Sequence, residues 1–74
     1  MDKTVKINTE YIKLSNLLKL ANIVSSGSEA KYLVLDSKAL VNDEICTERG
    51  RKIYPGMKVT GEYEGEKFNL TVIS

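Results

Sequence analysis

The sequence predicts an α+β domain in which a helix-turn-helix hairpin packs on a small, mostly antiparallel β-sheet. Three observations support this fold class. Apolar residues recur with helical spacing up to about residue 36, and after it they alternate with polar residues. A serine-rich turn separates the two helical segments. A chain of 74 residues is short for more than one domain, so we expect a single domain over residues 1–74.

The first part of the chain predicts a short strand and a helix. Val5–Ile7 alternates apolar and basic residues, which is typical of an edge strand with one covered face. A helix is expected from near Lys13 to Asn22. Its inward stripe follows the i, i+3, i+4, i+7 spacing and comprises Leu14, Leu17, Leu18 and Ala21, with Leu20 and Val24 widening it.

A second helix is expected from about Gly27 to Asp36. Ser26 followed three residues later by Glu29 predicts a capping box, in which the serine hydroxyl accepts a first-turn amide and the glutamate reaches back to the cap. Only a few residues separate the two helices, so they should form a tight hairpin. The inward positions of the second helix are Ala30, Leu33 and Val34.

The rest of the chain predicts strands joined by turns. In the Tyr54–Gly56 turn, proline presets φ and glycine accepts a positive φ. Phe68, Leu70 and Val72 should share one face of the final hairpin. The strands expected are Lys38–Val41 and Ile45–Thr47 around an Asn42-Asp43 turn, and, after the charged loop Glu48–Lys52, Met57–Tyr63 and Phe68–Ile73 around Glu64-Gly65.

The charges are distributed unevenly along the chain, although the net charge is only +1. From Lys13 to Lys58, eight basic residues face five acidic ones, a difference of +3. From Val59 onward, one basic residue faces three acidic ones, a difference of −2. A moderate positive patch with an acidic back is typical of a directional binding face.

Several classes of function are disfavoured by composition. The chain has no histidine, and histidine is the commonest general base and metal ligand. The glycines are isolated rather than spaced as in a nucleotide-binding loop. Cys46 is expected to be a small core residue. We therefore expect no enzymatic activity, cofactor or metal site. The single cysteine and the absence of a long apolar stretch predict a cytoplasmic protein without membrane contact.

Two segments are candidates for binding phosphate. Arg49-Gly50-Arg51-Lys52 places three cations around a glycine, and arginine matches phosphate oxygens in bidentate geometry. A solvated loop would explain this run equally well. The Ser26–Ser28 turn can present helix amides to a phosphate, although a simple helix cap is the commoner role of such a turn. The order of a cap, a basic helix face and a basic loop in one small domain favours binding.

Four segments of the chain resemble the RNA-binding domain of the ribosomal-protein S-four type, over roughly Lys13 to Val59. They are Lys13–Leu18, Ser26–Lys31, Ala39–Asp43 and Tyr54–Gly56, while Ser25–Lys31 and Arg49–Gly56 are closer still to the small stand-alone, YaaA-like bacterial members. The resemblance implies a helix hairpin on a small sheet (the alpha-L RNA-binding motif), with RNA held by the helices and the adjoining loop. It matches Lys13, Lys31, the Ser26–Ser28 turn and Asn42 to family positions. Gly27 stands where the family often has an RNA-contacting arginine, and Ser15 where it has aspartate.

The leading hypothesis is that the protein binds structured RNA, ribosomal or otherwise folded, through its phosphate backbone. Its four tyrosines are scattered in sequence and predict no dense stacking platform. The alternative is a protein–protein adaptor that keeps the fold with weakened RNA binding, which the near-neutral charge and Gly27 favour. The RNA-binding residues expected are Lys13, Lys19, Ser26, Ser28, Lys31, Lys38, Asn42, Arg49, Arg51 and Lys52.

Overall fold

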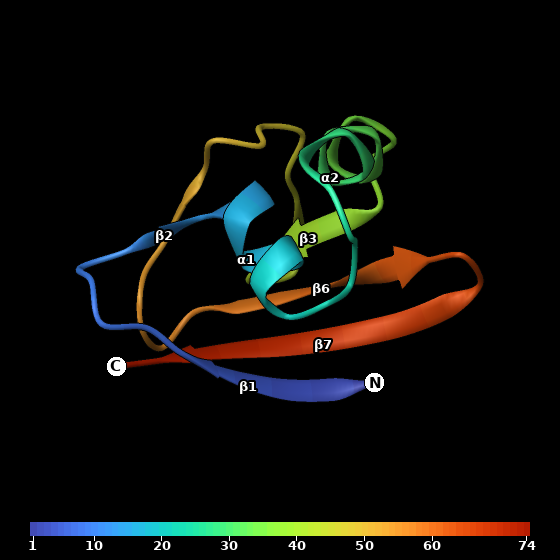
Figure 1. Cartoon of the computed structure of the whole chain (residues 1–74). Coiled ribbons are helices and arrows are strands. Elements are labelled where there is room, and N and C mark those ends of the chain that lie inside the picture. The colour runs from blue at the N-terminus through green and yellow to red at the C-terminus, as the bar shows by residue number, and fades with distance from the viewer.

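In a computed structural model that describes residues 1–74, the strands form a main sheet and a separate small ribbon (Figure 1). The main sheet has the order β1-β7-β6-β3-β4, and its strands are β1 Asp2–Lys6, β7 Glu66–Ile73, β6 Lys58–Tyr63, β3 Ala39–Val41 and β4 Glu44–Ile45. The ribbon pairs β2 (Ile12–Lys13) with β5 (Lys52–Ile53). β1 runs parallel to β7 and all other pairings are antiparallel, which confirms a mostly antiparallel α+β fold.

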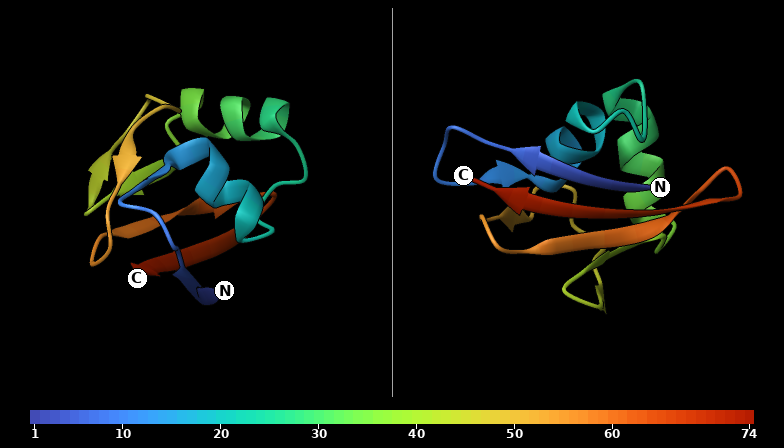
Figure 2. Two further views of the ribbon diagram at one scale, coloured as in Figure 1. Left: turned by 60° about the vertical axis from the view of Figure 1, so that its left-hand side comes forward. Right: turned by 90° about the horizontal axis from the view of Figure 1, so that it is seen from below.

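Helices α1 (Leu14–Leu20) and α2 (Gly27–Leu35) contact each other and cover one face of the main sheet (Figures 1 and 2). The covered face is apolar because alternate strand residues point toward the helices, as Phe68, Leu70 and Val72 do along β7. The opposite face is solvated, and it carries polar residues such as Asn69 and Thr71 together with the exposed apolar side chains of Ile45 and Ile73. Neither helix has the length and apolarity that crossing a membrane requires.

The helical stripes were predicted correctly except at one position. Leu14, Leu17, Leu18 and Ala21 are buried in a core of 18 residues, as are Val24, Ala30, Leu33 and Val34. Leu20 is 57% exposed, because its position on α1 lies roughly 110° from the middle of the stripe. It does not widen the inward face as expected.

The predicted helix ends need small corrections. α1 ends at Leu20 rather than Asn22, because the chain reverses at Asn22 with a φ of 60°. α2 ends at Leu35, and Asp36 is its C-cap. At the start of α2 the Ser26 hydroxyl accepts a hydrogen bond from the Glu29 backbone N–H at 3.3 Å, as predicted. The Glu29 carboxylate, however, accepts from the hydroxyl of Ser25 at 2.7 Å and from its backbone N–H at 3.3 Å, one residue before the expected position.

The strand predictions were right in type and inexact in extent. The first strand is longer than Val5–Ile7 and begins at Asp2, at the sheet edge as expected. β4 stops at Ile45, and Cys46 is a buried core residue just beyond it. Asn42 and Asp43 both have positive φ, at 50° and 71°, which confirms the hairpin turn between β3 and β4. The β2–β5 ribbon was not predicted, because strands of two residues have no readable period.

Candidate nucleic-acid interface

The basic loop is fixed against the start of α1 by backbone hydrogen bonds. Leu14 donates its N–H to the carbonyl of Arg51 at 2.9 Å, and Ser15 donates to the carbonyl of Arg49 at 3.0 Å. No side chain caps this helix. The loop carbonyls therefore satisfy amides that a helix start otherwise leaves open. In the adjoining ribbon Lys13 pairs with Lys52, which holds the two segments side by side.

An open hollow of about 540 Å³ lies where this loop meets the first turns of both helices. It brings together three segments that are far apart in sequence. No lining residue is acidic or hydrophobic, and three are cationic. We call it the basic hollow, and its lining residues are Lys13, Ser15, Asn16, Gly27, Ser28, Lys31, Arg49 and Gly50.

The chemistry of the basic hollow suits an anion. Lys13, Lys31 and Arg49 are all exposed, so each can reach a ligand while its side chain stays solvated. Gly27 and Ser28 open α2, where unpaired amides and the helix dipole favour negative charge. Three like charges without an acid in the lining repel one another, and a bound phosphate chain would reduce that repulsion.

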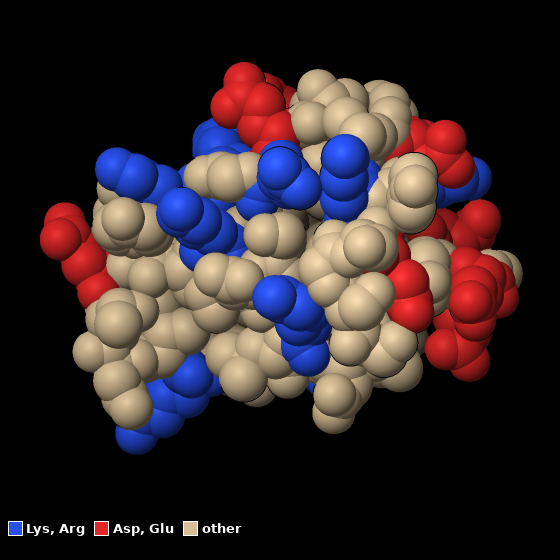
Figure 3. Space-filling model, turned by 45° about the horizontal axis from the view of Figure 1, so that its top comes forward, with Lys and Arg blue, Asp and Glu red and all other residues tan.

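The surface charges separate into two sides. Figure 3 shows basic side chains gathered across the face formed by the helix starts and the loop, with most acidic side chains toward the edge where the β6–β7 hairpin lies. The sequence predicted this division from the opposite net charges of its two parts. The structure therefore presents one face toward polyanions and turns another away from them.

Four of the ten residues predicted to bind RNA line the basic hollow: Lys13, Ser28, Lys31 and Arg49. Lys19 lies close by, since its Nζ is 4.0 Å from the point where a Cβ on Gly27 would stand. Ser26 precedes the hollow, and its hydroxyl is occupied by the helix cap. Arg51 and Lys52 follow directly in the loop and are exposed.

Lys38 and Asn42 are not brought to the basic hollow. Lys38 lies at the start of β3, where it lines a different hollow with Asp36, Glu62 and Glu64. Asn42 holds the corner between β3 and β6: its Oδ1 accepts from the Lys58 N–H at 3.0 Å, and its own N–H donates to the Lys58 carbonyl at 2.9 Å. These hydrogen bonds give Asn42 a structural role.

Comparison with known proteins identifies the family to which the chain belongs. The family model described as the S4 domain matches residues 5–70, most of the chain. The chain belongs to the S4 domain family. A probable ribosome maturation protein RlbA of Bacillus subtilis (strain 168) is 45% identical to this S4 domain over 65 residues, which cover 88% of the chain and 89% of that protein. A tyrosine–tRNA ligase of Idiomarina loihiensis is 31% identical over 77 residues, covering 95% of the chain but only 18% of the ligase.

The structure of this S4 domain adds residues that sequence reasoning missed. Ser15 and Asn16 line the basic hollow beside Lys13. Asn16 lies outside the apolar stripe of the first helix, so the stripe indicates that it points outward but not what faces it. Tyr11 and Tyr54, which looked scattered, have ring centroids only 5.7 Å apart.

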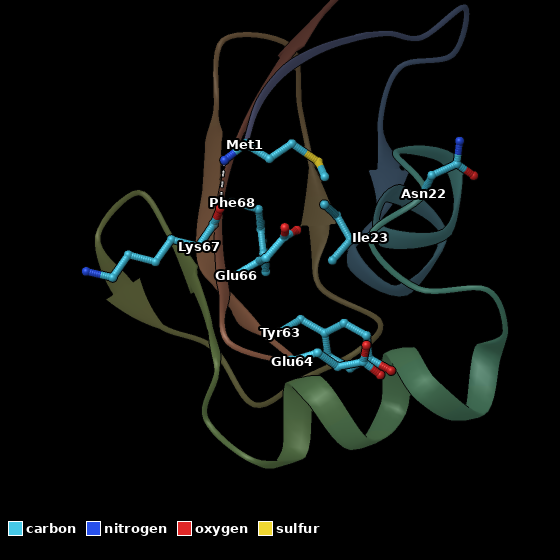
Figure 4. Close-up of a pocket in the computed structure, with 8 residues that line it drawn as sticks. All are labelled: Met1, Asn22, Ile23, Tyr63, Glu64, Glu66, Lys67 and Phe68. Carbon is cyan, nitrogen blue, oxygen red and sulfur yellow. Dashed lines mark hydrogen bonds between the residues drawn. The ribbon is translucent and has the colours of Figure 1, made fainter.

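A second hollow, of about 320 Å³, lies on the acidic side of this S4 domain (Figure 4). Its lining includes the carboxylates of Glu64 and Glu66, while the Lys67 side chain points away from it. The amino group of Met1 donates to the Lys67 carbonyl at 2.8 Å and so fastens β1 to β7. The two carboxylates make this hollow less suited to a phosphate than the basic hollow is.

A hydrogen-bonded group links α2 to the main sheet behind the basic hollow. The hydrogen bond from the Ser25 hydroxyl, together with those from the Ser25 amide and the Tyr63 hydroxyl, lowers the pKa of the Glu29 carboxyl. Partial burial and the same carboxylate raise the pKa of Tyr63, whose hydroxyl donates to Glu29 at 3.1 Å. This contact fixes the N-terminal turn of α2, and with it Gly27 and Ser28, relative to β6.

Proposed function

We propose that this S4 domain binds structured RNA through phosphate contacts at the basic hollow and that it acts in ribosome maturation. The observation that carries the proposal is the convergence of Lys13, Lys31 and Arg49 on one hollow without an acidic residue. The two helices and the loop would then serve as an alpha-L RNA-binding motif. The name of the Bacillus relative supports a substrate of ribosomal origin, and such a role would place the protein in the cytoplasm.

Recognition by shape and charge fits the residues of the hollow. A helical RNA presents regularly spaced phosphates and 2′-hydroxyls, whereas its base edges in the deep major groove are out of reach of side chains. Lysine and arginine neutralise the phosphates, and Ser15, Asn16 and Ser28 can bond to phosphate or sugar oxygens.

The test compares two triple variants that change the net charge equally. Lys13→Glu, Lys31→Glu and Arg49→Glu reverse the cations of the basic hollow, and Lys6→Glu, Lys38→Glu and Lys67→Glu reverse three exposed cations outside it. Binding to a labelled RNA hairpin and to ribosomal subunits would be measured at salt concentrations from about 50 to about 200 mM. Affinity that depends on phosphate contacts falls steeply over this range.

We expect the first triple variant to lose binding and the control to retain it. Each phosphate contact contributes about 0.7–0.9 to the slope of log affinity against log salt. The three cations of the basic hollow should therefore contribute about 2–3 to this slope if each contacts one phosphate. If the control loses as much affinity as the first variant, binding follows net charge alone and the basic hollow is not the site. Circular dichroism would verify that both variants are folded.

The adaptor alternative keeps one specific observation in its favour. Tyr32 and Leu35 lie three residues apart on the outer side of α2 and are 71% and 57% exposed. Apolar side chains in this arrangement are typical of a protein-docking face. Replacing both with serine would separate the two functions. An adaptor would lose its association with ribosomal particles in this variant, whereas an RNA-binding protein would lose it in the hollow variant.

A further inference from the structure

Tyr11 and Tyr54 form a fixed aromatic pair next to the basic hollow. Their ring centroids are 5.7 Å apart and the rings are tilted by 49°, which is a favourable geometry for two aromatic rings. The Lys52 Nζ lies 4.9 Å from the centre of the Tyr11 ring. The β2–β5 ribbon creates this arrangement, because Ile12 pairs with Ile53 and the two tyrosines flank that pair.

The pair is not explained by the hydrophobic core. Neither tyrosine belongs to the 18 buried residues or to the partly buried residues packed against them. Tyr54 is 39% exposed, and Tyr11 is half-buried. The ribbon therefore holds two aromatic rings at the solvent-exposed surface. Little apolar area is buried there, so burial contributes little free energy to fixing the rings in place.

A neighbouring hollow connects Tyr11, one member of this pair, to the proposed phosphate site. It measures about 510 Å³ and is lined by Thr9, Glu10, Tyr11, Ile12, Lys13 and Asn16. Lys13 and Asn16 line the basic hollow as well, so the two hollows adjoin. The neighbouring hollow contains one carboxylate and one ammonium and has no net charge, so a neutral planar group fits it better than a second phosphate does.

We propose that Tyr11, Tyr54 and Lys52 form a stacking subsite for one unpaired base of the RNA whose backbone occupies the basic hollow. The inference rests on the proposed function and specifies its substrate class: an RNA helix carrying a bulged or terminal unpaired nucleotide. Tyr54 offers the more exposed ring, Tyr11 packs against it, and Lys52 adds a cation beside the rings. Every base has a π-face, so the subsite selects for an unpaired base rather than for a sequence.

The experiment uses two RNA hairpins that differ at one position. One carries a single bulged 2-aminopurine in its stem and the other is fully paired. We expect the protein to bind the bulged hairpin more tightly by about 5- to 150-fold, the range that base–aromatic stacking provides. We also expect the 2-aminopurine fluorescence to be quenched when the protein binds.

Three variants assign the effect to the rings. Tyr54→Leu keeps an apolar side chain but removes the ring, and it should abolish both the preference and the quenching. Tyr54→Phe should retain both, because stacking needs only the ring. Tyr32→Leu is the matched control, since Tyr32 is 71% exposed on α2 and outside the subsite; it should behave as the unaltered protein.

The outcomes separate this inference from the proposed function. Equal affinity for the two hairpins, unaffected by Tyr54→Leu, would overturn the stacking subsite. Phosphate binding would survive that result if affinity still depended on salt and on the cations of the basic hollow. If neither hairpin binds, or if binding does not weaken with added salt, the proposed function is overturned together with the subsite.

Discussion

The backbone N–H of Ser15 donates to the carbonyl oxygen of Arg49 at 3.0 Å, so the first turn of α1 is capped by the main chain of the basic loop. The cap leaves the Arg49 side chain free and exposed at the basic hollow. A change of the Arg49 side chain therefore leaves the cap in place. This separation is what allows binding variants of the loop to be tested in a folded protein.

Asn42 should prove important for stability and not for RNA binding. Replacing it with alanine removes the acceptor of the Lys58 N–H and the short polar side chain that favours a φ of 50° at this position. We expect the free energy of unfolding to fall by about 1–3 kcal/mol, measured by urea denaturation. Asn42→Asp keeps the acceptor and should cost less. A stable Asn42→Ala variant with weakened RNA binding would instead support the contact role expected from the sequence.

Gly61 should tolerate no side chain. A β-carbon there would collide with the Lys38 carbonyl oxygen and stand 2.6 Å from Cζ of Phe68, so the backbone before β3 and the Phe68 ring would both have to move. We expect Gly61→Ala to lower the free energy of unfolding by about 1–3 kcal/mol or more, as overpacking does. Gly50→Ala is the matched control, because nothing lies within 4 Å of its β-carbon position. Similar urea midpoints for the two variants would contradict the prediction.

The hydrogen bonds of Glu29 should make stability depend on pH in acid. Its pKa in the folded protein lies below the ordinary 4.5, so its contribution is present in full above pH 4.5 and is lost as the pH falls through the folded value. In Glu29→Gln, thermal midpoints should change less over this acidic range than in the unaltered protein. Ser25→Ala removes the largest cause of the lowered pKa and should give an intermediate profile. Parallel profiles for all three proteins would show that Glu29 does not contribute.

Local patterns were enough to predict both helices and most strands of the main sheet, but not the β2–β5 ribbon. The leucine spacing of the first helix, the serine cap of the second and the positive φ at Asn42 and Gly56 all depend on a few neighbouring residues, and each is present in the structure. One error could have been avoided by the same local reasoning. Leu20 was assigned to the core because it is apolar, although its angle on the helix directs it outward.

The kinds of residue in the candidate site were predictable from the sequence. Which of them meet in space was not. The family resemblance pointed to Lys13 and Lys31, and the basic loop pointed to Arg49. Nothing local to Lys38 showed that it would lie on the acidic side, just before β3. The meeting of Tyr11 with Tyr54 depends on the pairing of Ile12 with Ile53. Such a two-residue ribbon leaves no periodic trace in the sequence.

Gly27 offers a gain-of-function test of the basic hollow. A β-carbon at this position would meet only the end of the Lys19 side chain, 4.0 Å away, and Gly27 is exposed, so a side chain can begin there without moving the backbone. Gly27→Arg would add a bidentate phosphate ligand at the opening of α2. We expect RNA affinity to rise on the order of tenfold and the salt slope to steepen by about 0.7–0.9. The free protein should become slightly less stable, because a cation at a helix N-terminus opposes the dipole.

Gly27→Gln separates the charge of the new side chain from its length. It should leave the salt slope unchanged and improve affinity little, because a neutral amide releases no counterion. Both variants would be compared with the unaltered protein by fluorescence anisotropy with the labelled hairpin, and thermal midpoints would be recorded in parallel. If Gly27→Arg folds but changes neither affinity nor slope, the RNA backbone does not approach the start of α2. Phosphate contacts would then be confined to Lys13 and the loop around Arg49.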